Sequence, residues 1–121
     1  MKKILVVEDN YKNRELLEAV LQAQGYRVIT AVNGNEGIYK AKEHKPDLIL
    51  MDIQMPRIDG FKAAKALKSD PQTSGLKIIA VTSFAMKGDR EEILDADFDA
   101  YMSKPLDTRK LVKLVNDMIA C

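Results

Sequence analysis

Short apolar runs alternate with amphipathic segments along the 121-residue chain, and this alternation constrains the fold more than any single motif. The apolar runs are short and contain many Val, Ile and Leu residues, which favours β-strands over helices. Between them, apolar residues recur at spacings of three and four, which is typical of helices that cover a sheet. The chain is therefore predicted to alternate strand and helix from end to end.

The predicted strands are Lys3–Glu8, Tyr26–Ala31, Asp47–Asp52, Lys77–Thr82 and Asp99–Ser103. Two helices are predicted from apolar stripes, one made by Leu16, Leu17, Val20 and Leu21, the other by Leu111, Leu114, Val115 and Met118. Gly25 is predicted to end the first of them, because glycine is the usual residue after a helix C-terminus. Three further helices are predicted around Asn35–His44, Gly60–Ser69 and Lys87–Ala96.

Five strands that alternate with five helices form a parallel sheet with both faces covered. Right-handed crossovers leave few topologies, and we predict a flavodoxin-like (βα)5 doubly wound sheet with strand order 2-1-3-4-5. Residues 1–121 are expected to form a single domain, since this length is that of one ordinary domain. In such sheets ligands bind at the carboxyl ends of the strands, near the switch point between the first and third strands.

Composition excludes several classes of protein. The hydrophobic share of 46% and charged share of 31% are those of a globular domain and argue against disorder. The net charge of 19 − 18 = +1 gives no reason to expect nucleic acid or a membrane surface as a partner. No apolar run reaches the length of a signal peptide core or a membrane span, and the single Cys121 can form no internal disulfide, so we expect a cytoplasmic protein.

Polar residues end the strands that the topology places together. Glu8 and Asp9 end the first strand, Asp52 ends the buried third strand, Thr82 and Ser83 end the fourth, and Lys104 follows the fifth. The second strand, at the outer edge, ends without a charge. One crevice is thus predicted to collect three carboxylates, a hydroxyl and an ammonium.

Three carboxylates in one crevice require a cation or protons. Two unit charges ~5 Å apart at an effective dielectric of ~20 repel by about 3 kcal/mol. Hard oxygen ligands without His or Cys suit Mg²⁺, with Mn²⁺ as the other candidate, and Mg²⁺ typically meets a phosphate. A carboxylate such as Asp52 can itself be the nucleophile and form an aspartyl-phosphate, whose charge Lys104 would help to neutralise.

Each of these residues also has a purely structural interpretation. Asp9 or Asn10 could cap the first helix, and Thr82 could be an ordinary strand residue. Lys104 could be a surface lysine, and Tyr101, which lies within the fifth predicted strand and not at its end, could be a core aromatic with a solvated hydroxyl. The joint occurrence of these residues at strand ends favours the functional interpretation.

The blocks "ILVVEDN", "LILMDIQMPRIDG", "IIAVTSFA" and "DAYMSKP" resemble the signature blocks of receiver domains of two-component response regulators, in order and over essentially the whole chain. The resemblance implies that Asp52 is the phosphoacceptor. It implies that Glu8, Asp9, Asp52 and the backbone carbonyl of Gln54 bind Mg²⁺. Thr82 and Lys104 correspond to the hydroxyl and the ammonium that meet the phosphate, and Tyr101 to the switching aromatic.

The family then implies a phosphorylation-dependent signalling switch. The donor would be a histidine kinase or phosphotransfer protein. The output would pass to a target protein through the face formed by the fourth helix, fifth strand and fifth helix, without nucleic acid or membrane. "FAMKGD" resembles stand-alone receivers, and because the chain ends soon after its last helix no DNA-reading domain is expected. Beyond phosphoryl transfer to and from itself, no enzymatic turnover is expected. Asp97 stands where the family usually has glycine, which leaves the local turn open.

Three alternatives remain at this point. A flavodoxin-type protein shares the fold, but "EDNYKN" after the first strand would repel a phosphate unless a metal intervened. A haloacid-dehalogenase-like phosphatase would carry a second Asp two residues after the nucleophile, where this chain has Gln54. A degenerate receiver would act as a phosphorylation-independent interaction module, although all the site positions are intact.

Overall fold

The computed structural model describes residues 1–53, 60–82, 98–103 and 107–120. Within these ranges the elements follow in the order β1 (Lys3–Val7), α1 (Tyr11–Ala23), β2 (Arg27–Ala31), α2 (Gly34–His44), β3 (Leu48–Asp52), α3 (Gly60–Ser69), β4 (Lys77–Thr82), β5 (Ala100–Ser103) and α5 (Thr108–Ala120). None of these helices has the length and apolar character needed to cross a bilayer. The helix predicted around Lys87–Ala96, and Asp97 after it, lie outside the described residues.

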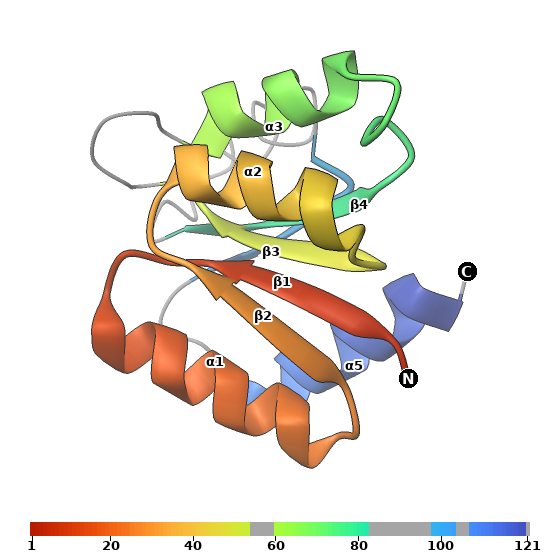
Figure 1. Ribbon diagram of the computed structural model, residues 1–121. Coiled ribbons are helices and arrows are strands. Elements are labelled where there is room, and N and C mark those ends of the chain that lie inside the picture. The colour runs from red at the N-terminus through yellow and green to blue at the C-terminus, as the bar shows by residue number, and fades with distance from the viewer. Residues whose placement is uncertain (54–59, 83–97, 104–106, 121) are drawn as a thin grey trace.

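The strands form one parallel sheet in the order β2-β1-β3-β4-β5, which confirms the predicted topology (Figure 1). Several predicted strands extend one residue beyond the observed ones. Most of these extra residues still bond to the sheet, but the backbone N–H of Tyr26 donates to the carbonyl of Leu21 in α1 instead. The backbone N–H of Glu8 donates to the carbonyl of Ala31 at 3.0 Å, and that of Asp47 donates to the carbonyl of Lys3 at 2.8 Å. At Glu8 and Asp47 the apolar pattern therefore detects a hydrogen-bonded run slightly longer than the regular strand.

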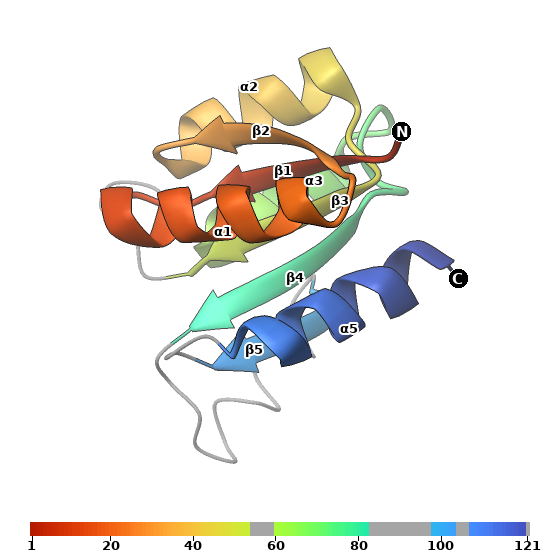
Figure 2. The same ribbon diagram turned by 90° about the horizontal axis from the view of Figure 1, so that it is seen from below.

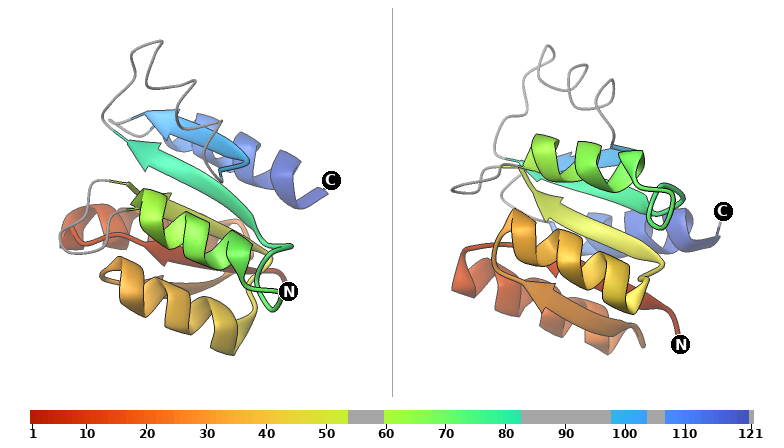
Figure 3. Two further views of the ribbon diagram at one scale, coloured as in Figure 1. Left: turned by 90° about the horizontal axis from the view of Figure 1, so that it is seen from above. Right: turned by 45° about the horizontal axis from the view of Figure 1, so that its top comes forward.

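Helices cover both faces of the sheet. α1 and α5 lie on one face and α2 and α3 on the other, as Figures 1 and 2 show from two directions, and Figure 3 views α2 and α3 over the strands. Side chains along β1 alternate between the two cores, since Ile4 and Val6 belong to the α1/α5 core and Leu5 and Val7 to the α2/α3 core. This period of two is the expected result of the strand pleat. β3 is buried along its whole length because both of its faces are covered.

Local signals at the ends of α1 agree with the prediction for Gly25. Gly25 has a φ of 90°, and the N–H groups of Gly25 and Tyr26 donate to the carbonyls of Gln22 and Leu21 at 3.0 and 3.2 Å. These two bonds form a Schellman motif, for which glycine is the preferred residue. The prediction for Leu16 in the apolar stripe is wrong: Leu16 is 44% exposed, whereas Leu17 and Leu21 are buried.

Helix α2 lies unusually close to the end of β1. A Cβ atom added to Gly37 would stand 2.8 Å from Cγ2 of Val7, so only glycine permits this approach without a shift. Val7 directly precedes Glu8, the first of the strand-end carboxylates. Helix α2 thus packs directly against the residue that precedes the carboxylate cluster.

Candidate functional site

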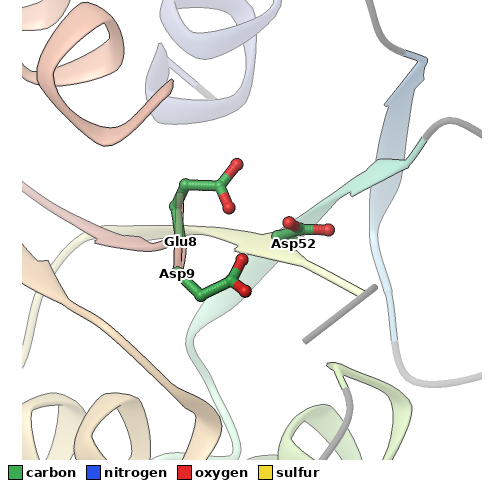
Figure 4. Close-up of side chains that lie close together, drawn as sticks. All are labelled: Glu8, Asp9 and Asp52. Atoms are coloured by element: carbon green, nitrogen blue, oxygen red, sulfur yellow. The ribbon is translucent and has the colours of Figure 1, made fainter. Parts of the chain in front are cut away.

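Three carboxylates meet at the carboxyl edge of the sheet. Glu8 and Asp9 follow β1, Asp52 is the last residue of β3, and one carboxylate oxygen of each lies within 4.8 Å of the others. Figure 4 shows the Glu8 and Asp9 side chains directed toward Asp52. Glu8 and Asp52 are only 1% and 3% exposed, whereas Asp9 is exposed. Two carboxylates of the cluster are therefore buried, and the third, that of Asp9, lies on its solvent-exposed side.

The parallel register explains this meeting of residues that are 43 or more positions apart. Val7 is the register partner of Met51, so the next residue along each strand, Glu8 and Asp52, reaches the same height. Past Asp52, the N–H of Ile53 still donates to the carbonyl of Val81 at 3.2 Å. Sheet pairing thus continues through the site and places both carboxylates on rigid backbone.

The loop after β1 is organised by Asn10. Its Oδ1 accepts from the N–H of Asn13 at 3.0 Å, which makes Asn10 the N-cap of α1. Its own N–H donates to Oε2 of Glu8 at 3.2 Å. Of the two residues that could have capped this helix, Asn10 does so, and the carboxylate of Asp9 points to the cluster instead (Figure 4).

Thr82 and Tyr101 occupy neighbouring positions on β4 and β5. Thr82 is fully buried at the end of β4, one residue beyond Val81, the register partner of Asp52. Tyr101 pairs with Ala80, is half-buried and packs against the α2/α3 core. Tyr101 is therefore a diagonal neighbour of Thr82, within the reach of an aromatic side chain. This arrangement permits coupling between the two, although their roles stay predictions.

Gln54 and Lys104 lie outside the described residues, so their predicted roles toward the metal and the phosphate also stay predictions. Sequence reasoning missed Arg14. From the first turn of α1 its guanidinium donates to the backbone carbonyl of Glu8 at 2.9 Å. An arginine in a helix gives no sequence signal for such a bond.

The donor set fits a hard divalent cation. All three groups are carboxylates with converging oxygens, and no His or Cys is among them. Mg²⁺ and Mn²⁺ prefer such oxygen ligands, and a bound cation would offset the repulsion between three negative charges. Glu8, Asp9 and Asp52 are thus able to hold a metal ion.

A doubly wound sheet whose carboxyl edge gathers acids around a buried strand-end aspartate is the arrangement expected of a signalling receiver domain. Residues 4–116 match the family described as response regulator receiver domain. The chain belongs to this family and acts in two-component signalling. This membership removes the flavodoxin-type and dehalogenase-like phosphatase alternatives, and a receiver domain is not a conventional metabolic enzyme.

Relatives and solved structures agree with this assignment. The polar-differentiation response regulator DivK of Brucella anthropi is 42% identical over 118 residues, which are 98% of this chain and 96% of that protein. DivK of Brucella ovis is 41% identical over the same shares. The receiver domain of the Pseudomonas aeruginosa sensor histidine kinase PA1611, with a magnesium ion coordinated in its active site cleft, has a TM-score of 0.91 at 34% identity, with 99% of this chain and 98% of that chain covered. The Vibrio cholerae chemotaxis protein CheY4 has a TM-score of 0.91 at 29% identity, with 98% of each chain covered.

Proposed function

We propose that this protein is a phosphorylation-dependent switch that accepts a phosphoryl group on Asp52. The observation that carries the proposal is the convergence of Glu8 and Asp9 on this nearly buried carboxylate, within 4.8 Å. A carboxylate at the rigid end of a central strand is held in place to act as a nucleophile. Its two acidic neighbours would repel it if no cation were bound, and they therefore support a Mg²⁺-dependent reaction.

The reaction is a transfer between two protein side chains. A carboxylate oxygen of Asp52 forms a bond to phosphorus, and the bond between phosphorus and the donor's imidazole nitrogen breaks. Mg²⁺ held by Glu8, Asp9, Asp52 and the Gln54 carbonyl would supply charge neutralisation at the phosphoryl oxygens. Lys104 is proposed to pair with the same oxygens, and hydrolysis of the acyl phosphate would return the protein to its starting state.

The donor is proposed to be a histidine kinase or a phosphotransfer protein of the cytoplasm. Such donors carry the phosphoryl group on histidine, and the family membership supports a donor of this kind. The relatives named DivK are polar-differentiation response regulators, and the match spans 96% of the Brucella anthropi protein, which is therefore little more than a receiver domain. We propose that the output to a target protein uses the face that includes β5 and α5.

The switch is proposed to connect Asp52 with that face through Thr82 and Tyr101. A phosphoryl group adds charge and strong acceptor oxygens, so the Thr82 hydroxyl gains a hydrogen-bond partner near Asp52. Movement of Thr82 would change the space beside its diagonal neighbour Tyr101 on the adjacent strand. The Tyr101 ring, half-buried in this structure, would face outward before phosphorylation and turn inward after it.

Acetyl phosphate tests the phosphoacceptor. With Mg²⁺ present, mass spectrometry of the intact protein and of its peptides should find one phosphoryl group on Asp52. The Asp52→Asn variant should gain none, and removal of Mg²⁺ by EDTA should abolish the reaction in the wild type. Phosphorylation at another residue, or equal incorporation without a divalent cation, would contradict the proposal. A protein that never reacts but binds its partner all the same would be the degenerate module.

Beryllofluoride, a phosphoryl mimic, tests the switch. With Mg²⁺ it should alter amide hydrogen exchange in Thr82 and in β5. The Thr82→Ala variant should lose the change in β5 while it still accepts a phosphoryl group from acetyl phosphate. Identical exchange in β5 with and without the mimic in the wild type would show that Tyr101 is not part of a switch.

A further inference from the structure

Arg14 donates to backbone carbonyls of the acidic loop, which is the segment of residues 8–10 between β1 and α1. Its Nη1 atom donates to the carbonyl oxygen of Glu8 at 2.9 Å and reaches the carbonyl oxygen of Asp9 at 3.4 Å. These two residues supply two of the three carboxylates of the cluster. One cationic side chain thus contacts both peptide units from which the metal-binding side chains extend.

Tyr11 holds this guanidinium from the other side. The Arg14 guanidinium carbon lies 5.6 Å from the centre of the Tyr11 ring and over its face, in cation–π geometry. The Tyr11 hydroxyl donates to Oε1 of Glu15 at 2.9 Å, which fixes the ring on the surface of α1. Tyr11, Arg14 and Glu15 are three and four residues apart, so the helix brings them onto one side.

The acidic loop is the part of the site that most needs such support. Glu8 is buried, but Asp9 is exposed and belongs to neither β1 nor α1. Repulsion among Glu8, Asp9 and Asp52 acts to turn the Asp9 peptide away from the cluster when no cation is bound. A charge-assisted hydrogen bond to the carbonyls opposes that rotation because it fixes the peptide planes.

We propose that Arg14, supported by Tyr11, is a positioning residue for the metal site. It holds the Glu8–Asp9 backbone so that both carboxylates already face Asp52 before Mg²⁺ binds. The inference rests on the proposed function, since it requires that the cluster binds Mg²⁺. The effect of Arg14 on Mg²⁺ affinity distinguishes positioning from a simple charge effect. A positive charge near a cation site lowers Mg²⁺ affinity, whereas a positioning contact raises it.

Mg²⁺ titration of the folded protein, by calorimetry and by thermal melts, tests the proposal with Arg14→Met. Methionine keeps an unbranched stem but removes the donors and the charge. We expect the half-saturating Mg²⁺ concentration to rise about tenfold, the lower end of what loss of an outer partner costs a metal site. Arg27→Met is the matched control, because Arg27 is exposed at the start of β2, at the opposite edge of the sheet. It should bind Mg²⁺ as the wild type does.

Two further variants separate positioning from structure and charge. Arg14→Lys keeps the charge and can still donate to one carbonyl, so its affinity should fall between those of Arg14→Met and the wild type. Tyr11→Ala should weaken Mg²⁺ binding in the wild type, but should have no further effect in the Arg14→Met background, because the two residues act as one unit. Additive effects of the two substitutions would overturn the role of Tyr11 as support.

Unchanged or tighter Mg²⁺ binding in Arg14→Met would overturn the proposal. So would a lower melting temperature that Mg²⁺ raises by the same amount as in the wild type, since that is what a merely structural role predicts. Asp9→Asn distinguishes this failure from that of the proposed function. If Asp9→Asn responds to Mg²⁺ like the wild type, the metal site itself is wrong. If only Asp9→Asn loses the response, the metal site holds and the role of Arg14 is wrong.

Discussion

The two edges of the sheet use carboxylates in opposite ways. At the carboxyl edge, Glu8, Asp9 and Asp52 are gathered together, and like charges face each other. At the amino edge, where the strands begin, and at the helix ends beside it, three described carboxylates each have a donor. Asp47 pairs with Lys2 and accepts from the Lys3 N–H, Asp70 pairs with Lys42, and Asp99 pairs with Lys68. The carboxylates of one edge are paired with donors, and those of the other form a cluster that could hold a cation.

Asp99 shows most clearly how the amino edge is built. Its Oδ2 accepts from Lys68 Nζ at 3.1 Å and from the backbone N–H of Ile78 at 2.8 Å. Its own N–H donates to the carbonyl of Ile78 at 2.8 Å. One side chain therefore ties α3, the start of β4 and the approach to β5. The acidic cluster at the other edge has three carboxylates that face one another, and a cation could join them.

The largest expected effect is the response of Asp9→Asn to Mg²⁺. In the wild type, Mg²⁺ well above its dissociation constant should raise the free energy of unfolding by about 1 to 3 kcal/mol. Asp9→Asn should lose most of this gain, because a neutral amide replaces a charged ligand. Its metal-free form should be more stable than the metal-free wild type by up to about 1 kcal/mol, since repulsion is relieved. Thermal melts of both proteins with and without Mg²⁺ check this, and equal metal responses would refute it.

Asp99→Ala should act in the opposite direction. Loss of its acceptor leaves the partly buried Ile78 N–H without its side-chain partner, so unfolding should become easier by about 1 to 2 kcal/mol. The solvated ion pair with Lys68 adds little to this figure. Urea unfolding measures the change, and Mg²⁺ should stabilise the variant as much as the wild type. A control is Asp117→Ala in the exposed pair with Lys113, which should change stability by less than about 0.5 kcal/mol. Similar losses in both variants would show that Asp99 is an ordinary surface residue.

The smallest expected effect is the dependence of stability on pH that Asp70 causes. The N–H of Gln72, and then the Lys42 ammonium, hold the pKa of Asp70 below its ordinary value. Because the folded-state pKa is lowered, the contribution of Asp70 is present above the ordinary carboxyl value and is lost as the pH falls through the lowered one. Asp70→Asn should therefore be less stable than the wild type near neutral pH, and the gap should close as the pH falls through and below the ordinary carboxyl range. Urea unfolding over this range decides it; a gap independent of pH would show that the charge contributes nothing.

The fold and the carboxylate cluster were predictable because both depend on patterns along the chain. Apolar runs such as Leu48–Met51 identify buried strands, and a parallel sheet brings the ends of its central strands to one edge. The order of the strands then follows from few allowed topologies. Asp52, Glu8 and Asp9 needed no side-chain geometry to be placed together.

The remaining features depend on tertiary contacts that no local pattern records. Asn10 and Asp9 are both good caps, and only the direction of the chain leaving β1 decides between them. Leu16 has the same apolar character as Leu17, but the position of α1 on the sheet leaves it exposed. The bonds from Arg14 to the Glu8 and Asp9 carbonyls join a helix to the loop before it, where sequence spacing alone permits many alternatives.

Residue-resolved NMR during a Mg²⁺ titration tests the contrast between the two edges most directly. The amide signals of Glu8, Asp9, Asp52 and Ile53 should shift together and saturate with one dissociation constant. Those of Asp47, Asp70 and Asp99 at the amino edge should stay in place, because their carboxylates already have donors. Equal, unsaturable shifts at acidic residues of both edges would mean that Mg²⁺ only screens surface charge, and would contradict a metal site beside Asp52.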